Sequence, residues 1–336
     1  LAPLPVKAAN FLSEITGIYA FGDSLTDTGN LFSATGGALP PSDFFFNGRV
    51  SNGPNWLDYL AQGLNLQSPT PFLSGLPPVD GVNFATGGAT SGLENTLDIP
   101  GLPSLQQQIA AFVTPLQIAN QLADTNGLYI VWGGGNDYLP TESQTFTPFE
   151  TPDATIQNLT TAITALASVG AKHILAVNLP DLGTTPRALG NDPLVPLSAG
   201  DPTPLELNNV TEAHNAELLD ALDSLRQSFP STHFLTYDVN SVFDDVTSDP
   251  AAFGFTNVTE PCLFTMSCFF DPAQQQQYLF WDGIHPTTRG HQIIAREALE
   301  TLSQKKHVPE PSMVMGIFAF GLLAMGRCRG VQNSRK

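Results

Sequence analysis

Ser24, Asp282 and His285 have the side chains that ester cleavage by a serine requires, although they lie far apart along the chain. Ser24 belongs to residues 21–25 (FGDSL), directly after an apolar run, and the other two belong to residues 282–286 (DGIHP). A serine hydroxyl is a poor nucleophile near neutral pH unless an imidazole accepts its proton and a carboxylate holds that imidazole in the correct tautomer. Asp282 lies three positions before His285 in one predicted loop, so it can orient the imidazole. The two segments therefore predict nucleophilic catalysis by Ser24.

The other histidines offer no comparable pair with a carboxylate in a loop before a helix. They are His173, His214, His233, His291 and His307. The motif G-x-S-x-G, which marks the nucleophile of the common α/β-hydrolases, is absent from the sequence. Asp23 and Asp27 are close to Ser24, but such carboxylates are typical of turn formation.

Two glycine-rich turns supply hydrogen-bond donors for a developing oxyanion. Residues 83–90 (NFATGGAT) and 133–137 (GGGND) each follow a predicted strand, and the second turn adds the neutral amide of Asn136. Backbone N–H groups at glycines can approach a ligand closely. An oxyanion hole needs such uncharged, fixed donors, and loss of one typically lowers turnover by about 10²–10³-fold. We expect Asp137 and Arg49 to support the loops around these donors.

Short apolar runs alternate along the chain with segments of helical periodicity. The predicted strands are Gly17–Phe21, Val82–Ala85, Leu128–Trp132, Ile174–Asn178 and Phe234–Asp238. The predicted helices are Pro54–Leu64, Leu105–Leu122, Ala154–Ser168, Leu205–Ser228 and Thr288–Ser303. The alternation predicts an α/β fold in a single domain, a three-layer α/β/α sandwich around a doubly wound, mainly parallel sheet of about five strands. The carboxyl ends of the strands carry the site in such folds, and Ser24 and both turns follow strands.

Four long segments rich in Pro, Gly, Ser and Thr interrupt this pattern. They are Leu31–Gly53, Leu139–Pro152, Thr185–Pro204 and Ser241–Leu279. Loops of this length in a compact domain are usually functional or disordered, so we expect them to form walls or a lid over Ser24. The first contains Phe44, Phe45 and Phe46, which fit either a wall that contacts an acyl chain or ordinary packing.

Composition limits the class of protein. The 336 residues are 42% hydrophobic, enough for the core of one large α/β domain. Residues 1–304 carry 7 Lys and Arg against 30 Asp and Glu, a formal charge of −23, whereas residues 305–336 are at +5. So acidic a body repels phosphates, which excludes nucleic-acid binding.

The cysteines are too few for a disulfide scaffold, and Cys262, Cys268 and Cys328 lack His or Cys partners at zinc spacing. Cys262 and Cys268 flank a loop short enough for a local disulfide in an oxidising compartment. Two free buried thiols fit the sequence equally well.

The end of the chain has three features in order. Residues 308–312 (VPEPS) interrupt the preceding helix, residues 313–325 are uncharged and apolar, and Arg327 and Arg329 follow. The apolar run is shorter than the roughly 17–25 residues that a lone spanning helix needs. The order Pro-Glu-Pro, apolar run and basic end resembles the PEP-CTERM sorting signal of Gram-negative bacteria. This resemblance implies export to the extracellular space or cell surface, transient contact of the tail with the inner membrane, and processing by an exosortase-type enzyme.

The chain from about residue 17 to residue 303 resembles the GDSL, or SGNH, serine hydrolases, in particular their phospholipase- or lecithinase-like branch. Four blocks occur in the family's order, at residues 21–30, 83–90, 133–138 and 281–287. Residues 48–56 (GRVSNGPNW) and 290–291 match the same branch. We therefore expect three parts, which are a lead segment at 1–16, an SGNH hydrolase domain of flavodoxin-like fold at 17–304 and a sorting tail at 305–336.

The family resemblance also implies the residues of the site. Ser24 would be the nucleophile, His285 the general base and then acid, and Asp282 the carboxylate that orients it. The N–H groups of Ser24 and Gly88 and the Nδ2 of Asn136 would form the oxyanion hole, with Gly88 preferred to its neighbour by position in its block. No metal and no organic cofactor is implied.

These observations predict an exported bacterial esterase or lipase, possessing a serine nucleophile, that cleaves an ester or lipid through an acyl-enzyme. A carbohydrate O-deacetylase or an acyltransferase with the same site is an alternative, because the long loops decide the substrate and the acceptor. A second alternative is an exported protein that only binds lipid or glycan in an extracellular matrix.

Overall fold

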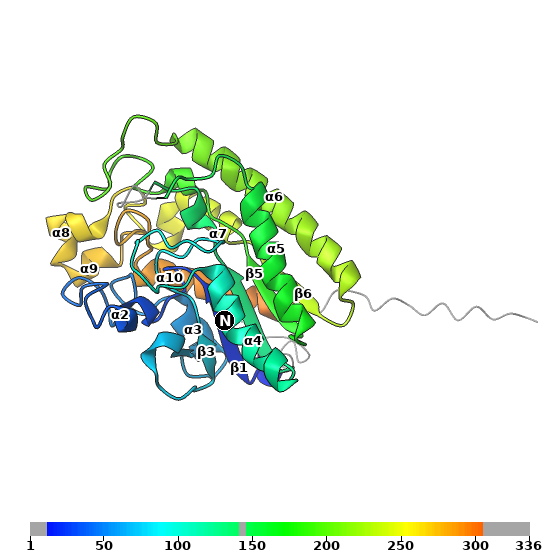
Figure 1. The fold of residues 1–336 in the computed structure, drawn as a ribbon. Coiled ribbons are helices and arrows are strands. Elements are labelled where there is room, and N and C mark those ends of the chain that lie inside the picture. The colour runs from blue at the N-terminus through cyan, green and yellow to red at the C-terminus, as the bar shows by residue number, and fades with distance from the viewer. Residues whose placement is uncertain (1–11, 141–145, 305–336) are drawn as a thin grey trace, which may run out of the picture. The chain divides into compact units, whose positions relative to one another are not determined.

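A computed structural model describes residues 12–140 and 146–304 (Figure 1). Contacts divide the chain into two units, Leu1–Lys306 and His307–Lys336, and every described residue belongs to the first. The predicted lead segment, residues 1–16, is described only from residue 12, and the predicted tail lies outside the described residues. Within the described ranges no helix has the length and apolar character needed to cross a membrane.

A six-stranded sheet forms the centre of the fold, with the strand order β2-β3-β1-β4-β5-β6 and parallel pairing throughout. The strands are β1 Gly17–Gly22, β2 Thr70–Pro71, β3 Gly81–Asn83, β4 Gly127–Trp132, β5 His173–Val177 and β6 His233–Tyr237. All six residues of β4 are buried, which explains its continuous apolar sequence, because parallel strands are covered on both faces. The predicted doubly wound parallel sheet is confirmed, and β2 is an additional strand.

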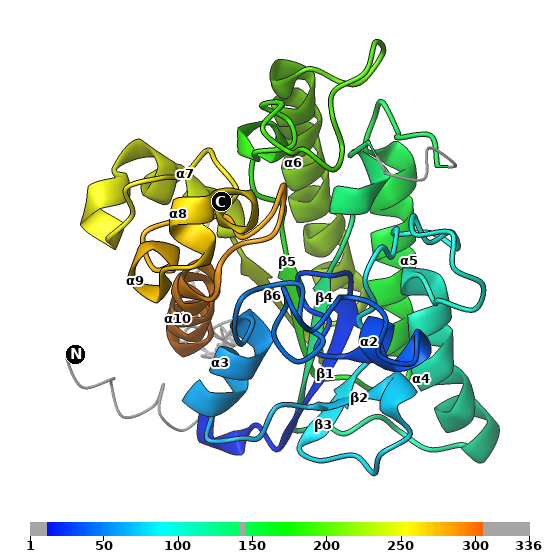
Figure 2. The same cartoon turned by 90° about the vertical axis from the view of Figure 1, so that its left-hand side faces the viewer.

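The described residues also form α-helices. They are α2 Asn30–Ala34, α3 Trp56–Gly63, α4 Leu105–Ala119, α5 Asp153–Ser168, α6 Pro204–Ser228, α7 Val239–Ser248, α8 Met266–Phe269, α9 Pro272–Gln275 and α10 Thr288–Gln304. Figure 2 shows α4, α5 and α6 on one side of the strands and α3, α7 and α10 on the other. Alternate strand residues supply the two cores, since Ile18 and Ile130 pack in the α3 and α10 layer, whereas Phe21 and Val131 pack against α4 and α5.

The long segment at 241–279 differs from the prediction of a loop, because it contains most of α7 and all of α8 and α9. Here Cys262 and Cys268 form a disulfide, so the alternative of two free thiols is wrong. Both cysteines are fully buried beside Trp281. The disulfide closes a loop of six-residue separation. The N–H groups of Cys262 and Leu263 donate to the Phe280 and Trp281 carbonyls, which joins this loop to the segment that leads to His285.

The strand order positions the site. β1 lies between β3 and β4, so the chain moves to one side of β1 first and then to the other. A crevice forms at such a switch point, outside the carboxyl ends of the strands. Ser24 follows β1, the 83–90 turn follows β3 and the 133–137 turn follows β4. These three segments therefore meet at one edge of the sheet.

Candidate active site

Ser24 lies in a tight turn directly after β1. The carbonyl of Asp23 accepts hydrogen bonds from the N–H groups of Thr26 at 3.1 Å and Asp27 at 2.9 Å, and the Asp23 Oδ1 accepts from Leu25 N–H at 3.0 Å. The peptide of Gly22 before the turn is bound on both sides by the Gln108 amide, at 2.9 and 2.8 Å. The turn is thus fixed from two directions, and Ser24 remains partly exposed.

His285 connects Ser24 to Asp282. The Ser24 Oγ lies 2.7 Å from the His285 Nε2, and the His285 Nδ1 lies 2.8 Å from both Asp282 carboxylate oxygens. Burial would raise the pKa of Asp282, but the neighbouring His285 and the N–H groups of Ile284 and His285 outweigh it, so this pKa is lowered. An ionised carboxylate only accepts hydrogen bonds, so Nδ1 carries the ring proton and Nε2 is free to accept from the Ser24 hydroxyl.

The two candidate backbone donors, Ser24 N–H and Gly88 N–H, find no hydrogen-bond acceptor among the residues that the structure describes. Gly87 differs, because its N–H donates to the Asp27 Oδ2 at 2.9 Å. Gly88 adopts φ +73°, and a Cβ there would lie 2.6 Å from the Asn95 Oδ1, so glycine is required. Of the two neighbouring glycines, only Gly88 therefore has an N–H without an acceptor among the described residues.

Asn136 supplies the third donor group from a 3-10 turn, Gly135–Asp137. Its Nδ2 donates to the Ala89 carbonyl at 2.9 Å, which fixes the plane of the amide and leaves its second N–H. Asp137 connects the same two turns, because its carboxylate accepts from Ser91 N–H at 2.9 Å and from the Thr155 hydroxyl at 2.8 Å. Its predicted supporting role therefore has a geometric basis.

Asp27 is a buried structural carboxylate rather than a second base. It accepts hydrogen bonds from the N–H groups of Gly29, Asn30 and Leu31 at the start of α2, in addition to that of Gly87. Burial raises the pKa of Asp27, and these bonds act in the opposite direction. Its four donors match the turn-forming role expected from the sequence.

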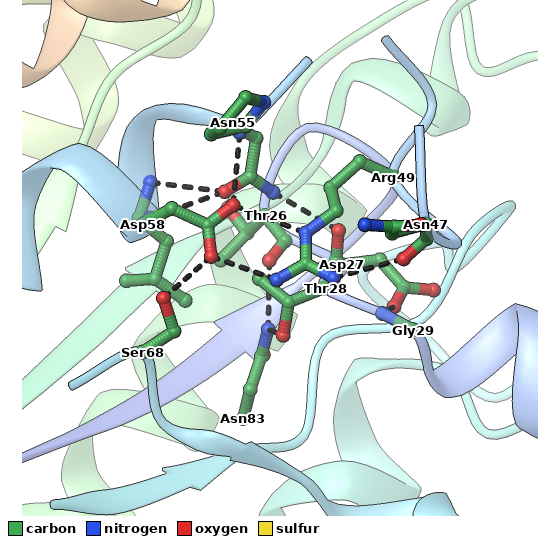
Figure 3. Close-up of polar contacts among 12 residues, drawn as sticks. Thr26, Asp27, Thr28, Gly29, Asn47, Arg49, Asn55, Asp58, Ser68 and Asn83 are labelled. Carbon is green, nitrogen blue, oxygen red and sulfur yellow. Dashed lines mark hydrogen bonds and ion pairs between the residues drawn. The ribbon is translucent and has the colours of Figure 1, made fainter. Parts of the chain in front are cut away.

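A polar network holds the Ser24 turn to the neighbouring loops (Figure 3). The Asn55 amide donates to the Asp27 carbonyl at 2.9 Å, and Asn55 caps α3 through a capping box with Asp58. Arg49 binds the Asp58 carboxylate with two nitrogens, at 3.0 and 2.8 Å. Asn83 adds a bond of 2.8 Å to the Thr26 carbonyl. Arg49 thus anchors the 31–53 loop, as predicted.

Two further residues, which the sequence did not identify, support the loop that carries His285. Arg187 N–H donates to the Gly283 carbonyl at 2.8 Å, and the Arg187 Nε donates to the Asp192 Oδ2 at 2.9 Å. Asp192 is 3% exposed and packs against Gly283, where a Cβ would lie 1.9 Å from the Asp192 Oδ2. Arg187 and Asp192 lie 98 and 93 positions before His285 in a Pro- and Gly-rich segment, so no local pattern reveals them.

Two other histidines are buried and belong to the scaffold. The pKa of His214 and that of His291 are lowered to about 3 by burial, so both rings are neutral. The His214 Nδ1 lies 2.9 Å from the Tyr138 hydroxyl. Neither contacts Ser24 in the way that His285 does.

A cleft of about 860 Å³ opens over Ser24 and His285, and most of its lining is apolar. All four long loops contribute to it, through residues such as Phe44, Leu139, Leu194 and Phe264. Phe45 also lines the cleft, so Phe44 and Phe45 both form part of the cleft wall. A second pocket of about 40 Å³, which also reaches Ser24 and His285, lies between Leu179, Phe243 and Phe280.

Comparison with known families gives two matches. The model of the GDSL-like lipase/acylhydrolase family matches residues 18–298, and the PEP-CTERM protein-sorting motif matches residues 307–329. The first covers well over half of the chain, including every residue of the candidate site. The second falls on the predicted tail and indicates an exported protein.

Curated relatives from plants and bacteria align with most of the chain. A GDSL esterase/lipase of Arabidopsis thaliana is 27% identical over 90% of this chain and 92% of its own. The thermolabile hemolysin of Vibrio parahaemolyticus is 27% identical, over 86% of this chain and 64% of its own. The phosphatidylcholine-sterol acyltransferase of Aeromonas hydrophila is 28% identical, over 89% of this chain and 93% of its own.

Proposed function

The chain belongs to the GDSL-like lipase/acylhydrolase family and is an exported carboxylic ester hydrolase, and on this premise we propose that it cleaves lipid esters through Ser24, His285 and Asp282. The observation that carries the proposal is the continuous hydrogen-bonded series from the Ser24 Oγ through both His285 ring nitrogens to the Asp282 carboxylate. Each of these three groups has the partner that nucleophilic catalysis requires.

In the first half-reaction the Ser24 Oγ attacks the ester carbonyl carbon while the His285 Nε2 takes the hydroxyl proton. The Asp282 carboxylate stabilises the resulting imidazolium without accepting its proton. When the tetrahedral intermediate collapses, the bond from carbon to the alkoxy oxygen breaks. His285 then returns the proton to that oxygen, so that a neutral alcohol leaves and an acyl-Ser24 ester remains.

The oxyanion of the intermediate would be bound by the N–H groups of Ser24 and Gly88 and by the Asn136 amide. Support comes from the two backbone N–H groups that lack an acceptor within the described residues and from the fixed amide plane of Asn136. Donors that are already in place need no reorganisation as charge develops, which is why they lower the barrier.

In the second half-reaction water attacks the acyl-Ser24 carbonyl after losing a proton to His285. Collapse of that intermediate releases the carboxylic acid, and the proton returns to Ser24. The apolar cleft favours a lipid ester over an acetylated carbohydrate, because a sugar would leave much of its polar surface without partners.

Acyl transfer to an alcohol is a second candidate for the same acyl-enzyme. The relative from Aeromonas hydrophila is named a phosphatidylcholine-sterol acyltransferase, and an apolar cleft can hold an apolar alcohol in place of water. Product analysis with a sterol present separates the two, since hydrolysis yields free fatty acid and transfer yields a sterol ester.

The segment from residue 305 would act as a sorting signal and would not be part of the catalytic domain at 17–304. We infer that it contacts the inner membrane of a Gram-negative-type bacterium transiently and is processed by an exosortase-type enzyme. The match of the PEP-CTERM motif to residues 307–329 and the basic residues Arg327 and Arg329 support this proposal.

Replacement of Ser24 by alanine tests the catalytic proposal. Ser24→Ala should fold normally and lose hydrolysis of a short p-nitrophenyl ester by about 10⁴-fold or more, because no other group takes over the attack. Ser33→Ala is the matched control, since the Ser33 hydroxyl donates to the Gly29 carbonyl at the N-terminal cap of α2. Near wild-type turnover by Ser24→Ala, with the fold verified by circular dichroism, would rule out Ser24 as the nucleophile.

A further inference from the structure

Five large apolar side chains are exposed at or beside the mouth of the cleft, and we call them the apolar rim. They are Phe44, Leu194, Phe264, Met266 and Phe270, which are 47%, 59%, 37%, 78% and 73% exposed. The first three also line the cleft that contains Ser24. Figure 1 places α8, which includes Met266, at the same end of the fold as α2, which follows the Ser24 turn.

The rim is held in place by its own packing. The ring of Phe269 lies 5.9 Å from that of Phe44, 4.8 Å from that of Phe270 and 6.0 Å from that of Trp281. The Trp281 Nε1 donates to the Phe44 carbonyl at 3.1 Å, so the two loops are joined by a hydrogen bond as well. The Cys262–Cys268 disulfide closes the loop that contains Phe264 and Met266. An apolar surface that is already ordered loses little conformational entropy on binding.

Single exposed apolar residues are common and need no explanation, but a contiguous group beside a cleft marks an interaction surface. We propose that the apolar rim docks this protein onto a surface of zwitterionic lipid, so that a lipid ester enters the cleft over Phe44 and Phe264. The inference rests on the proposed function, because it names the physical form of the ester substrate. Continuity between rim and cleft lets an acyl chain pass from bilayer to Ser24 without crossing water.

The negative charge of the protein distinguishes between the partners that the apolar rim could bind. Residues 262–270 contain no charged side chain, while residues 1–304 carry a formal charge of −23. So acidic a body is repelled by an anionic membrane, and two copies that met through this rim would repel each other. A zwitterionic surface such as phosphatidylcholine can bury the apolar rim without this repulsion.

A local tryptophan reporter tests the docking site on the full chain. In a Ser24→Ala background, Phe270→Trp places a reporter on the rim, and Leu122→Trp is the matched control because Leu122 is 74% exposed beyond the end of α4. The native Trp56, Trp132 and Trp281 are buried, residues 305–336 contain no tryptophan, and the Ser24→Ala protein without a reporter measures the native contribution, including that of Trp281 beside the rim. Vesicles of phosphatidylcholine with brominated acyl chains should quench the reporter at 270 and leave the one at 122 unchanged.

The quenching measurement needs binding but no catalysis, since it uses the Ser24→Ala protein, and its result is therefore independent of the catalytic proposal. Equal quenching at both positions, or none at 270, would overturn the docking site. Stronger quenching at 270 by brominated phosphatidylglycerol would overturn the choice of a zwitterionic surface. A wild-type dimer in light scattering that becomes monomeric in Met266→Ser/Phe270→Ser would assign the rim to a second copy of the chain instead.

Turnover provides a second test with the catalytic residues intact. Met266→Ser/Phe270→Ser should hydrolyse phosphatidylcholine vesicles about tenfold more slowly, since two side chains lose their burial in lipid. Hydrolysis of a soluble p-nitrophenyl ester should be unchanged, because neither residue lines the cleft. Ile118→Ser/Leu122→Ser is the control and should keep both activities. Equal losses on both substrates, or no loss on vesicles, would contradict the proposal.

Discussion

The buried aspartates near Ser24 have different hydrogen-bond partners. Asp282 faces His285, Asp27 is surrounded by four N–H donors, and Asp23 receives one at its side chain. The sequence predicted the pair Asp282 and His285 because it is local, three positions apart in one loop. Position in the family block favoured Gly88 over Gly87, but the sequence could not show the physical reason, because the bond from Gly87 to Asp27 joins residues 60 positions apart.

Asp23 gives a pH-dependent prediction about stability. It is 4% exposed, and burial raises its pKa from 3.8 to about 6, with the Leu25 N–H and nearby His285 acting in the opposite direction. The pKa of Asp23 is higher in the folded than in the unfolded protein. Ionisation of Asp23 therefore destabilises the folded state increasingly as pH rises from 4 to 6, and the full loss of stability is reached above pH 6. Asp23→Asn retains an acceptor for Leu25 and should exceed the wild type in unfolding free energy by about 2 kcal/mol at pH 7.5.

Urea unfolding at pH 4 and pH 7.5 measures this difference, which should shrink towards zero at the lower pH. Asp43→Asn, at an exposed position of the 31–53 loop, is the control for removal of a surface charge. A stability difference that stays constant between the two pH values would contradict the assignment of the raised pKa to Asp23.

Among the elements, the loop at 282–286 depends on a partner loop for its position. The Gly283 carbonyl accepts from Arg187 N–H, and the Asp192 carboxylate occupies the space beside the Gly283 Cα. The Arg187–Asp192 ion pair therefore supports the segment between Asp282 and His285. The helices and strands were predictable from their own periodicity, whereas this contact between two irregular segments depends on the folded chain.

Gly283→Ala tests whether this close packing positions His285. A Cβ at Gly283 would lie 1.9 Å from the Asp192 Oδ2 and 2.8 Å from its Cβ, so the loop or the Asp192 side chain bound to Arg187 must shift. A displacement of about 1 Å at reacting groups can cost on the order of 10²-fold in rate, so kcat for a soluble ester should fall by about 10- to 100-fold. KM should change less, because much of the apolar wall of the cleft, such as Phe44 and Leu139, comes from other loops.

Gly92→Ala is the matched control, since a Cβ there meets its nearest atom, the Asn158 Nδ2, at 3.5 Å. Its kcat should equal that of the wild type. Steady-state kinetics of the two variants, with melting temperatures to verify folding, separate the outcomes. A wild-type kcat in Gly283→Ala would show that this contact does not set the position of His285.

For the whole molecule, alternating apolar runs and helical segments were sufficient to predict the layered parallel sheet. β2 was missed because two residues give no periodic signal, and α7 because Val239–Ser248 lies at the start of a segment rich in turn residues. The Cys262–Cys268 bond could not be chosen from sequence, because it depends on the redox compartment. A disulfide suits an exported protein, and here it also holds the apolar rim beside the cleft.

The central claim is that Ser24 is an activated nucleophile, and covalent labelling by a fluorophosphonate measures this most directly. Only an activated serine reacts quickly with the probe, so mass spectrometry of digested wild-type protein should find the label on the peptide that contains Ser24. His285→Ala should lower the labelling rate by about 10³-fold or more, because the hydroxyl then lacks its base. Label on another serine, no label at all, or an unchanged rate in His285→Ala would contradict the account.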